Sequence, residues 1–379
     1  MIEPFLPKIE EIFENSLSKD KKQWNKSRKK FLFGYLCSVV EARNVEFDSA
    51  AVRLNGNVQK ASNLRRIQRF FAEFALDYVQ VALLIVSFLP VRKFKLCIDR
   101  TNWKFGTVDI NILVLSVYYK GAGIPVLFSL LDKQGCSHTA ERIDLLDRFI
   151  RIFGADRISC LIGDREFIGE QWYKYLLENK IRFYLRIPKH HRVKYEGRYE
   201  QAQNFLGSQK VKYMDDVEIE GFHLSMAITK APPDPAKPEQ EPDYVIVLTN
   251  GYAKKALDRY RLRWGIEVFF QNAKSRGFNL EKTHLRDLNR IAKLFAVISI
   301  ASCWLMLIGT WMTEKIKTVP IKNHLHPANS IFRIGLDTFQ QAYRHAATHT
   351  DRFLHLLDIL TYYFNQRILL LYLTKKNVM

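Results

Sequence analysis

The sequence has few of the residues that mark a disulfide-stabilised or zinc-binding protein. Its 379 residues include five cysteines, an odd number. No two of them have the spacing of a zinc site, and no signal peptide precedes them. We therefore expect a cytoplasmic protein whose cysteines are reduced and buried as small apolar side chains. The five are Cys37, Cys97, Cys136, Cys160 and Cys303.

Long uncharged hydrophobic runs are also scarce. One run, LFAVISIASCWLMLIGTWM at 294–312, has the length needed to cross a bilayer. It contains Ser299, Ser302 and Thr310 and directly follows a basic segment, so we expect a buried central helix of a large α/β domain. The run at 79–89 is too short to span and predicts another buried helix. Association with a membrane is the alternative that the longer run leaves open.

Acidic residues are too few to balance the basic ones. There are 58 Lys and Arg against 39 Asp and Glu, which gives a formal net charge of +19. Between residues 254 and 293 the ratio is 11 to 4. Such an excess favours a polyanionic partner, most often nucleic acid, with an anionic membrane surface as the competing explanation.

The N-terminal 90 residues have helical patterning. After a break at "NGN" (55–57), the stretch "SNLRRIQRFFAEF" places an apolar face opposite exposed basic residues, with Ser62 as its expected N-cap. A short helix followed by a basic one is typical of a helix-turn-helix DNA reader, and an ordinary helical bundle gives the same pattern. The exposed basic residues are Arg65, Arg66 and Arg69.

Residues 94–187 predict strands and helices in the order β-β-β-α-β-α-β, a mixed α/β sheet. Residues 188–247 predict a β-rich insertion that carries a proline-rich surface loop. Asp99 and Asp164 each follow a hydrophobic run and are expected to close a strand. Strand ends of open α/β sheets often bind ligands, although a strand-terminal Asp is also a common cap.

One further acid, Glu267, stands among cations and aromatics in "YRLRWGIEVFFQNAK" (260–274). In a helix, Tyr260, Arg263, Glu267 and Lys274 fall within a stripe about 60° wide. Three carboxylates from separate elements, Asp99, Asp164 and Glu267, could hold two Mg²⁺ ions, because Mg²⁺ prefers oxygen ligands. Such a metal pair supports phosphodiester chemistry, and the surrounding cations would bind the phosphates.

The sequence resembles the DDE transposases of bacterial insertion sequences, in the group marked by a Y-(2)-R-(3)-E-(6)-K signature. "DRTNWKFG" (99–106) and "GDREFIG" (163–169) are similar to the blocks around that group's first and second catalytic Asp. The resemblance runs from about residue 99 to residue 285. Four residues match the signature without departure: Tyr260, Arg263, Glu267 and Lys274.

The resemblance implies a ribonuclease-H-like catalytic core with a β-rich insertion. It implies an end-binding region at 1–90, a catalytic domain at 91–312 with the insertion at about 188–247, and a helical C-terminal region at 313–379 for packing or dimerisation. By the family pattern, the catalytic and metal-binding residues are Asp99, Asp164 and Glu267.

The resemblance also implies cut-and-paste transposition with two Mg²⁺ ions, for which Mn²⁺ can substitute. The partners are double-stranded DNA, as element ends and target, and a second copy of the chain in a cytoplasmic, nucleoid-associated complex. Glu166 is a candidate partner for Arg165, and Trp103 is expected in the core. The expected DNA-binding residues are Tyr260, Arg263, Lys274, Arg165, Arg65, Arg66 and Arg69.

Two rivals share most of these features. A metal-dependent endonuclease of the same fold would cut DNA without joining it, using the same metal site. A non-catalytic DNA-binding descendant of a transposase would keep the charge and lose an acid, and the presence of all three acids counts against it.

Overall fold

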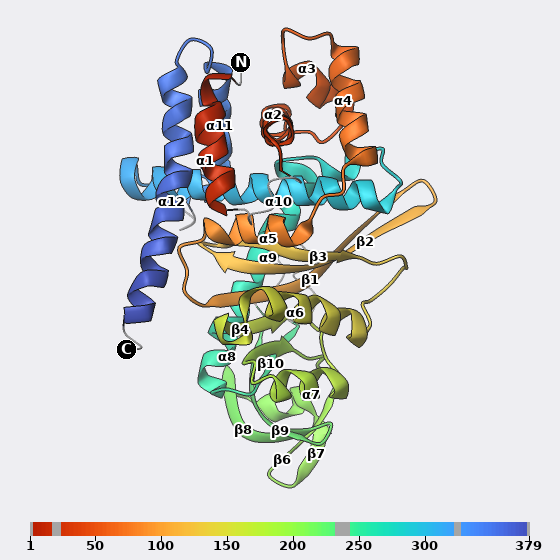
Figure 1. The fold of residues 1–379 in the computed structure, drawn as a ribbon. Coiled ribbons are helices and arrows are strands. Elements are labelled where there is room, and N and C mark those ends of the chain that lie inside the picture. Colours follow the sequence, from red (N-terminus) through yellow and green to blue (C-terminus); the bar gives the residue numbers. More distant parts are fainter. Residues whose placement is uncertain (1–2, 17–23, 232–242, 322–326, 377–379) are drawn as a thin grey trace. The chain divides into compact units, whose positions relative to one another are not determined.

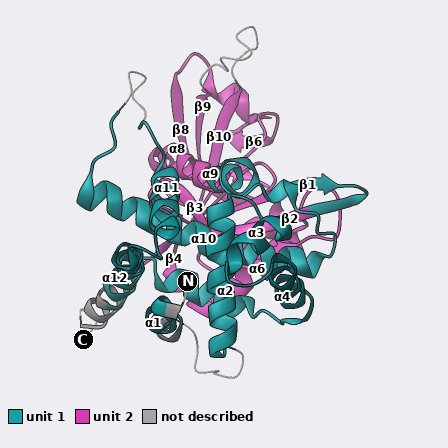
Figure 2. Ribbon diagram, turned by 90° about the horizontal axis from the view of Figure 1, so that it is seen from above, with its two compact units in different colours: residues 1–92, 102–110, 268–379 teal, residues 93–101, 111–267 magenta. Residues whose placement is uncertain are grey.

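The computed structural model describes residues 3–16, 24–231, 243–321 and 327–376. The chain forms two compact units (Figure 2). The helical unit comprises Met1–Arg92, Asn102–Ile110 and Val268–Met379, and the sheet unit comprises Lys93–Thr101 and Asn111–Glu267.

A ten-stranded sheet runs through the sheet unit, with the strand order β3-β2-β1-β4-β5-β10-β9-β8-β6-β7 (Figure 1). The distal ends of β1 and β2 are counted with the helical unit. The strands are β1 (Phe94–Phe105), β2 (Val108–Tyr119), β3 (Ala122–Leu130), β4 (Ile158–Gly163), β5 (Phe183–Arg186), β6 (Arg192–Tyr195), β7 (Arg198–Gln201), β8 (Val211–Ile219), β9 (Phe222–Lys230) and β10 (Tyr244–Thr249).

The first five strands have the ribonuclease-H-like arrangement. β1, β4 and β5 are parallel neighbours, and β2 pairs with β3 antiparallel. β1 and β2 are neighbours joined by two residues, a connection that only antiparallel strands allow. Parallel neighbours need crossovers, and α6 (Thr139–Phe153) and α7 (Glu170–Glu178) supply them. The predicted order β-β-β-α-β-α-β is confirmed.

The predicted β-rich insertion is confirmed, and it continues the same sheet. β10 pairs antiparallel with β5, β9 with β10, and β8 with β9. The hairpin of β6 and β7 ends the sheet. The backbone groups on the β5 edge are therefore bonded to β10 and are not left open to another chain.

Asp99 does not close its strand, contrary to the prediction. β1 continues to Phe105, so Asp99 lies in its middle. The hydrophobic run ends at Ile98 because the following residues alternate: Thr101 and Trp103 are buried, whereas Asn102 and Lys104 are exposed. Alternation of this kind is what a strand with one exposed face shows. Trp103 lies in the core, as predicted.

The helical unit contains the helices from both ends of the chain. α4 begins at Lys60 with Gln59 as its N-cap, so the prediction of Ser62 as N-cap is wrong. The apolar face is as expected, with Ile67 and Phe71 fully buried. The helices are α1 (Leu6–Ser16), α2 (Lys26–Ala42), α3 (Phe47–Leu54), α4 (Lys60–Glu73), α5 (Tyr78–Ser87), α10 (Leu288–Trp311), α11 (Ile331–Arg344) and α12 (Thr350–Lys376).

A buried asparagine fixes the turn between α3 and α4. The side-chain amide of Asn63 donates to the carbonyls of Ala51 and Asn55 at 3.0 Å each, and to that of Val58 at 3.5 Å. These carbonyls lie at the end of α3 and in the turn before α4, where no helical N–H group is available to them. The Asn63 side chain supplies the missing hydrogen-bond donors. A helix-turn-helix reader and a plain bundle both remain compatible with this arrangement.

The hydrophobic run at 294–312 forms most of α10. In the described parts of the chain, one helix, Leu288–Ile316, is long and apolar enough to cross a membrane, and its most apolar window is entirely buried. The pair of α4 and α5 passes the same test only as a span bent by 109°. The prediction of a buried helix is confirmed, but α10 belongs to the helical unit and not to the α/β domain in which it was expected.

The two compact units differ from the three segments expected from the sequence, since α10 and the helices after it cluster with the N-terminal helices. The division into end-binding, catalytic and C-terminal regions concerns their roles and stays a prediction. All five cysteines are free, and four are buried; Cys136 is exposed, contrary to the expectation.

Candidate active site

The register of two parallel strands brings Asp99 and Asp164 together. In the pairing of β1 with β4, Ile98 lies opposite Gly163. Asp99 and Asp164 are each the next residue along, on neighbouring backbones about 4.8 Å apart. The residue after each apolar run is thus an aspartate, and the strand register places the two aspartates side by side.

The segment that carries Glu267 is helical but irregular, and the prediction of one uninterrupted helix is wrong. α8 (Ala256–Tyr260) passes into a tighter 3-10 turn (Arg261–Arg263), α9 (Trp264–Gln271) follows, and a π-helical turn (Asn272–Arg276) ends the segment. The tightening changes the angular spacing of side chains. It still leaves Tyr260, Arg263 and Glu267 near one another, as their contacts show.

α9 approaches the hairpin of β2 and β3 unusually closely because glycines stand on both sides. A Cβ on Gly123 would lie 2.9 Å from the Cα of Ile266, and one on Gly265 would lie 3.0 Å from the backbone carbon of Ala122. Neither position has room for a side chain. This contact fixes the height of α9 above the sheet and therefore the position of Glu267.

The guanidinium of Arg263 lies between the three carboxylates. Its Nη1 donates to Asp99 Oδ2 at 2.9 Å and lies 3.8 Å from Asp164 Oδ2. Its Nη2 donates to Glu267 Oε1 at 2.6 Å. The Arg263 side chain is only 11% exposed. The structure therefore brings the three predicted acids to a single cation.

Tyr260 completes this cluster. Its hydroxyl donates to Asp164 Oδ1 at 3.1 Å, and the Arg263 guanidinium lies 5.7 Å from the centre of its ring. Burial raises the pKa of Tyr260 to about 12, so the phenol keeps its proton near neutral pH. Asp164 is thus oriented by a neutral donor as well as by a cation.

The shared environment acts most strongly on Asp99. Burial, helped by Asp164 and Glu267, raises the pKa of Asp99 to about 6, against the opposing effects of Arg263 and the Arg100 amide. For Arg263, burial acts to lower the pKa, but Tyr260 and the carboxylates outweigh it and raise the pKa. One guanidinium does not fully offset three crowded acids, so the cluster favours additional positive charge.

The donor set suits a hard divalent cation. It consists of carboxylate oxygens, which Mg²⁺ and Mn²⁺ prefer. Among the described residues, however, no group of three or more His, Cys, Asp or Glu is arranged to hold a metal ion. The guanidinium of Arg263 occupies the position between the oxygens, so a metal would fit these residues only after that side chain moves.

A partly buried polar network, which the sequence reasoning missed, supports the two aspartates. Arg100, directly after Asp99, donates from Nε to Glu166 Oε2 at 3.1 Å, and the two side chains are 17% and 14% exposed. Glu166 Oε1 also accepts from the amide and hydroxyl of Ser137, at 2.7 Å each. The sequence did contain a sign of this network: Arg100 follows Asp99 by one position, and Glu166 follows Asp164 by two.

Arg165 has a different partner from the one expected. It pairs with Asp243 at 2.9 Å, and Arg186 pairs with the same oxygen at 2.8 Å. The expectation that Glu166 pairs with Arg165 is therefore wrong, because Glu166 is turned toward Arg100 and Ser137. Arg165 and Glu166 are adjacent in the sequence, but their side chains point to different partners, which adjacency alone does not reveal.

The other expected DNA-binding residues belong to the helical unit. The Lys274 ammonium donates to the carbonyl of Asn102 at 2.9 Å and pairs with Glu281 at 2.8 Å. The three arginines of α4 are exposed, as predicted, and they are Arg65, Arg66 and Arg69.

Comparison with known proteins places this site in a family. A family model described as "Transposase DDE domain" matches residues 96–304, which is 209 of the 379 residues. No curated protein sequence matches the chain. A cryo-EM structure described as a piggyBac transposase synaptic complex with hairpin DNA is similar over 95% of this chain and 82% of that one, with 12% identity and a TM-score of 0.45. The matched region contains Asp99, Asp164 and Glu267, and the chain belongs to the family of transposase DDE domains.

Proposed function

We propose that this protein is a transposase that binds the terminal inverted repeats of its element and catalyses metal-dependent strand cleavage and strand transfer. One observation carries the proposal: carboxylates from β1, the end of β4 and α9 meet around one guanidinium in a chain of the transposase DDE family. Asp99 and Glu267 are 168 positions apart in the sequence, so the fold and not local structure brings their carboxylates to the same guanidinium.

In this proposal Asp99, Asp164 and Glu267 hold two Mg²⁺ ions, for which Mn²⁺ can substitute. When bound, the metal pair activates the attacking oxygen and stabilises the leaving one at a scissile phosphodiester. Tyr260 orients Asp164 through its hydroxyl, and the pair of Arg100 and Glu166 holds the two aspartate-bearing segments in place.

Arg263 has two alternative partners in this proposal. Without metal it neutralises the acids, as its contacts show. With metal bound, the metal would neutralise the carboxylates, and the planar guanidinium of Arg263 would be available to a DNA phosphate. Arg263 thereby lets metal binding and DNA binding favour each other.

DNA is the proposed partner throughout. Tyr260, Lys274 and Arg165 would bind near the scissile phosphate. Arg65, Arg66 and Arg69 would bind the element ends, and two copies of the chain would pair two ends. The net charge of +19 agrees with a polyanionic partner in the cytoplasm, at the nucleoid.

The test is nicking of a labelled duplex that carries the ends of the protein's own element, in Mg²⁺ or EDTA. We expect metal-dependent nicking at the element boundary by the wild type and none by Glu267→Gln or Asp164→Asn. Both variants should bind the ends almost as the wild type does, because the removed group is a metal ligand and not a DNA contact. Joined products in added plasmid would complete the assignment.

Two outcomes would contradict it. Nicking without joining under all conditions would make the protein an endonuclease. End binding without nicking in any metal would make it a DNA-binding protein, and the three acids would then have a structural role only.

A further inference from the structure

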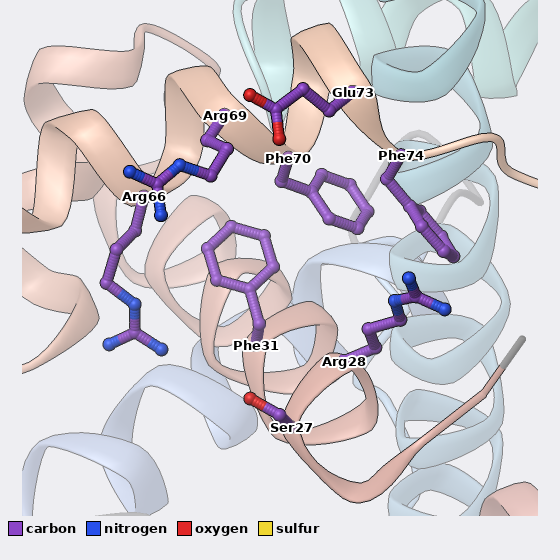
Figure 3. A pocket seen from close by; sticks show the side chains of 8 residues that line it. All are labelled: Ser27, Arg28, Phe31, Arg66, Arg69, Phe70, Glu73 and Phe74. Carbon is purple, nitrogen blue, oxygen red and sulfur yellow. The ribbon is translucent and has the colours of Figure 1, made fainter. Parts of the chain in front are cut away.

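A pocket of about 260 Å³ lies between α2 and α4 in the helical unit (Figure 3). It is separate from the carboxylate cluster in sequence and is built from the N-terminal helices alone. Its lining residues are Ser27, Arg28, Phe31, Arg66, Arg69, Phe70, Glu73 and Phe74.

Three phenylalanines form the apolar part of this pocket. Phe31, Phe70 and Phe74 keep 7%, 8% and 8% of their surface exposed. Ring centres are 4.7 Å apart for Phe31 and Phe70, and 5.0 Å apart for Phe70 and Phe74. Figure 3 shows all three side chains bordering the same space. Three adjacent aromatic rings offer apolar surface to a flat group that binds in the pocket.

Arginines stand on two sides of these rings. The Arg28 guanidinium lies 4.9 Å from the ring centre of Phe74, and that of Arg66 lies 5.9 Å from the ring centre of Phe31. Arg69 is exposed on the same side as Arg66 (Figure 3). Across the described ranges of the chain, neither Arg66 nor Arg69 has an acidic side chain within ion-pair distance, so their charge is open to an anionic ligand.

We propose that this pocket binds one unpaired nucleotide of a DNA strand, with the base against the phenylalanines and the adjoining phosphates on Arg66 and Arg69. The inference rests on the proposed function in that DNA is the partner. Arg66 and Arg69 complement a phosphate, and the rings complement a base. The Glu73 carboxylate can accept a hydrogen bond from an exocyclic amino group of the base.

The position of the phenylalanines in the lining favours an unpaired base over paired DNA. Within a duplex each base has both faces covered by its neighbours, so only a base outside the stack can reach the rings. Only the base has to enter the pocket, because its phosphates would lie outside on Arg66 and Arg69.

The test uses the full chain in EDTA, so that no strand is cut, and two hairpin duplexes with the same paired sequence. One has a blunt end, and the other has a short single-stranded overhang containing the fluorescent base 2-aminopurine. We expect the wild type to bind the overhang duplex more tightly and to change the 2-aminopurine emission. The double variant Arg66→Ala/Arg69→Ala should lose about tenfold in that preference, which corresponds to about 1.4 kcal/mol.

The matched control is Arg65→Ala, because Arg65 is exposed on the same helix and does not line the pocket. It should weaken both duplexes equally and leave the emission change intact. Phe74→Leu, verified as folded by thermal melting, should reduce the emission change while keeping the charge.

Two results would overturn the inference: equal losses on both duplexes for Arg66→Ala/Arg69→Ala, or no emission change with the wild type. Nicking of element ends in Mg²⁺ is measured separately. Normal nicking without overhang preference would remove only the pocket inference. Overhang preference without nicking would remove the transposase proposal and leave the pocket as a nucleotide-binding site.

Discussion

The guanidinium of Arg263 keeps together three carboxylates that would otherwise repel one another. It donates to Asp99 and Glu267 and lies within ion-pair distance of Asp164. Burial of the guanidinium strengthens these interactions, because less water screens them. A change at this one residue therefore alters the charge balance of the whole cluster.

The first prediction concerns Arg263→Gln. The variant should lose about 2–3 kcal/mol of unfolding free energy in EDTA, since removing one partner of a buried ion pair leaves uncompensated charge and these acids are partly exposed. Mn²⁺ should recover much of that loss by binding the freed carboxylates, while the wild type responds less. Thermal melts with and without Mn²⁺ measure both effects.

The control for Arg263→Gln is Arg261→Gln. The Arg261 side chain is 80% exposed and pairs only weakly with the exposed Asp258, at 3.4 Å. Its loss should change stability by about 0.5 kcal/mol or less, with no response to Mn²⁺. The assignment of Arg263 as the neutralising cation is wrong if both variants melt alike.

A second residue-scale prediction uses pH. For Asp243, burial acts to raise the pKa, but the Tyr244 amide together with Arg165 and Arg186 outweighs it and lowers the pKa below the ordinary 3.8. The stabilisation from Asp243 is therefore complete above pH 3.8 and is lost as pH falls through the lower folded value. Asp243→Asn should be less stable than wild type at neutral pH, and the difference should shrink below about pH 4.

The measurement is urea unfolding of the wild type and of Asp243→Asn from neutral pH to below about pH 4. The control is Asp258→Asn, whose carboxylate is 78% exposed and should leave the pH profile unchanged. A constant difference between Asp243→Asn and wild type from neutral to acid pH would show that the two arginine pairs do not cause the stabilisation.

At the scale of elements, the helix α9 and the hairpin of β2 and β3 are locked by their glycines. Gly123→Ala would place a Cβ 2.9 Å from the backbone of Ile266, one residue before Glu267. The Ser116 hydroxyl, 2.8 Å away, can rotate, but the atoms of Ile266 are backbone, so the helix must shift. We expect a loss of about 1–3 kcal/mol from overpacking.

The functional loss in Gly123→Ala should exceed the loss in stability. Displacement of a catalytic group by about 1 Å can cost roughly 100-fold in rate. The measurement is nicking rate together with thermal stability. Gly56→Ala is the control, because nothing lies within 4 Å of its added Cβ. Equal nicking by the two variants would mean that α9 is not held in place by this contact.

The type of a helix or strand could be predicted where its own pattern of apolar residues shows which faces are buried. The strands β2 and β4 are apolar on both faces, and α6 has a clear apolar stripe, so their type and order followed from the pattern. The end of β1 was not predictable, because the strand leaves the apolar run at Asp99 and continues with one exposed face. The same holds for the 3-10 turn at Arg261–Arg263, which the spacing of side chains alone does not distinguish from a regular helix.

At the scale of the whole molecule, the net charge of +19 should determine how strongly the protein binds DNA of random sequence. Affinity for random duplex should fall steeply with salt, because phosphate contacts release counterions. Arg65→Ala should lower the slope of log K against log salt by about 0.9 if Arg65 neutralises one phosphate. Fluorescence anisotropy across a salt series, on random and element-end duplexes, is the measurement.

The two duplexes separate the possible roles of Arg65. A greater loss on element ends than on random DNA would identify it as a reader of bases, whereas equal losses would identify a phosphate contact. An unchanged slope would exclude Arg65 from DNA altogether. Lys60, the first residue of the same helix, forms an exposed ion pair with Asp48, and Lys60→Ala serves as a basic-to-neutral control.

The composition of the two units could not be predicted from the sequence. The helical unit joins the first 92 residues with the last 112, and hydrophobic periodicity describes each helix without saying which distant helix covers it. The meeting of Asp99, Asp164 and Glu267 was predicted from their positions at the ends of apolar runs and on a basic helix, and the resemblance to a family with that spacing supported the prediction. The position of Arg263 between them required the three-dimensional arrangement.

The pairing of Ile98 with Gly163 has a consequence for errors in folding. Side chains alternate between the faces of a sheet, so a slip of one residue between β1 and β4 would turn one aspartate to the opposite face. It would also turn Leu96 and Ile98 away from their buried positions. A misregistered molecule would thus be unstable and inert together. We therefore expect no stable folded form that carries only part of the carboxylate cluster.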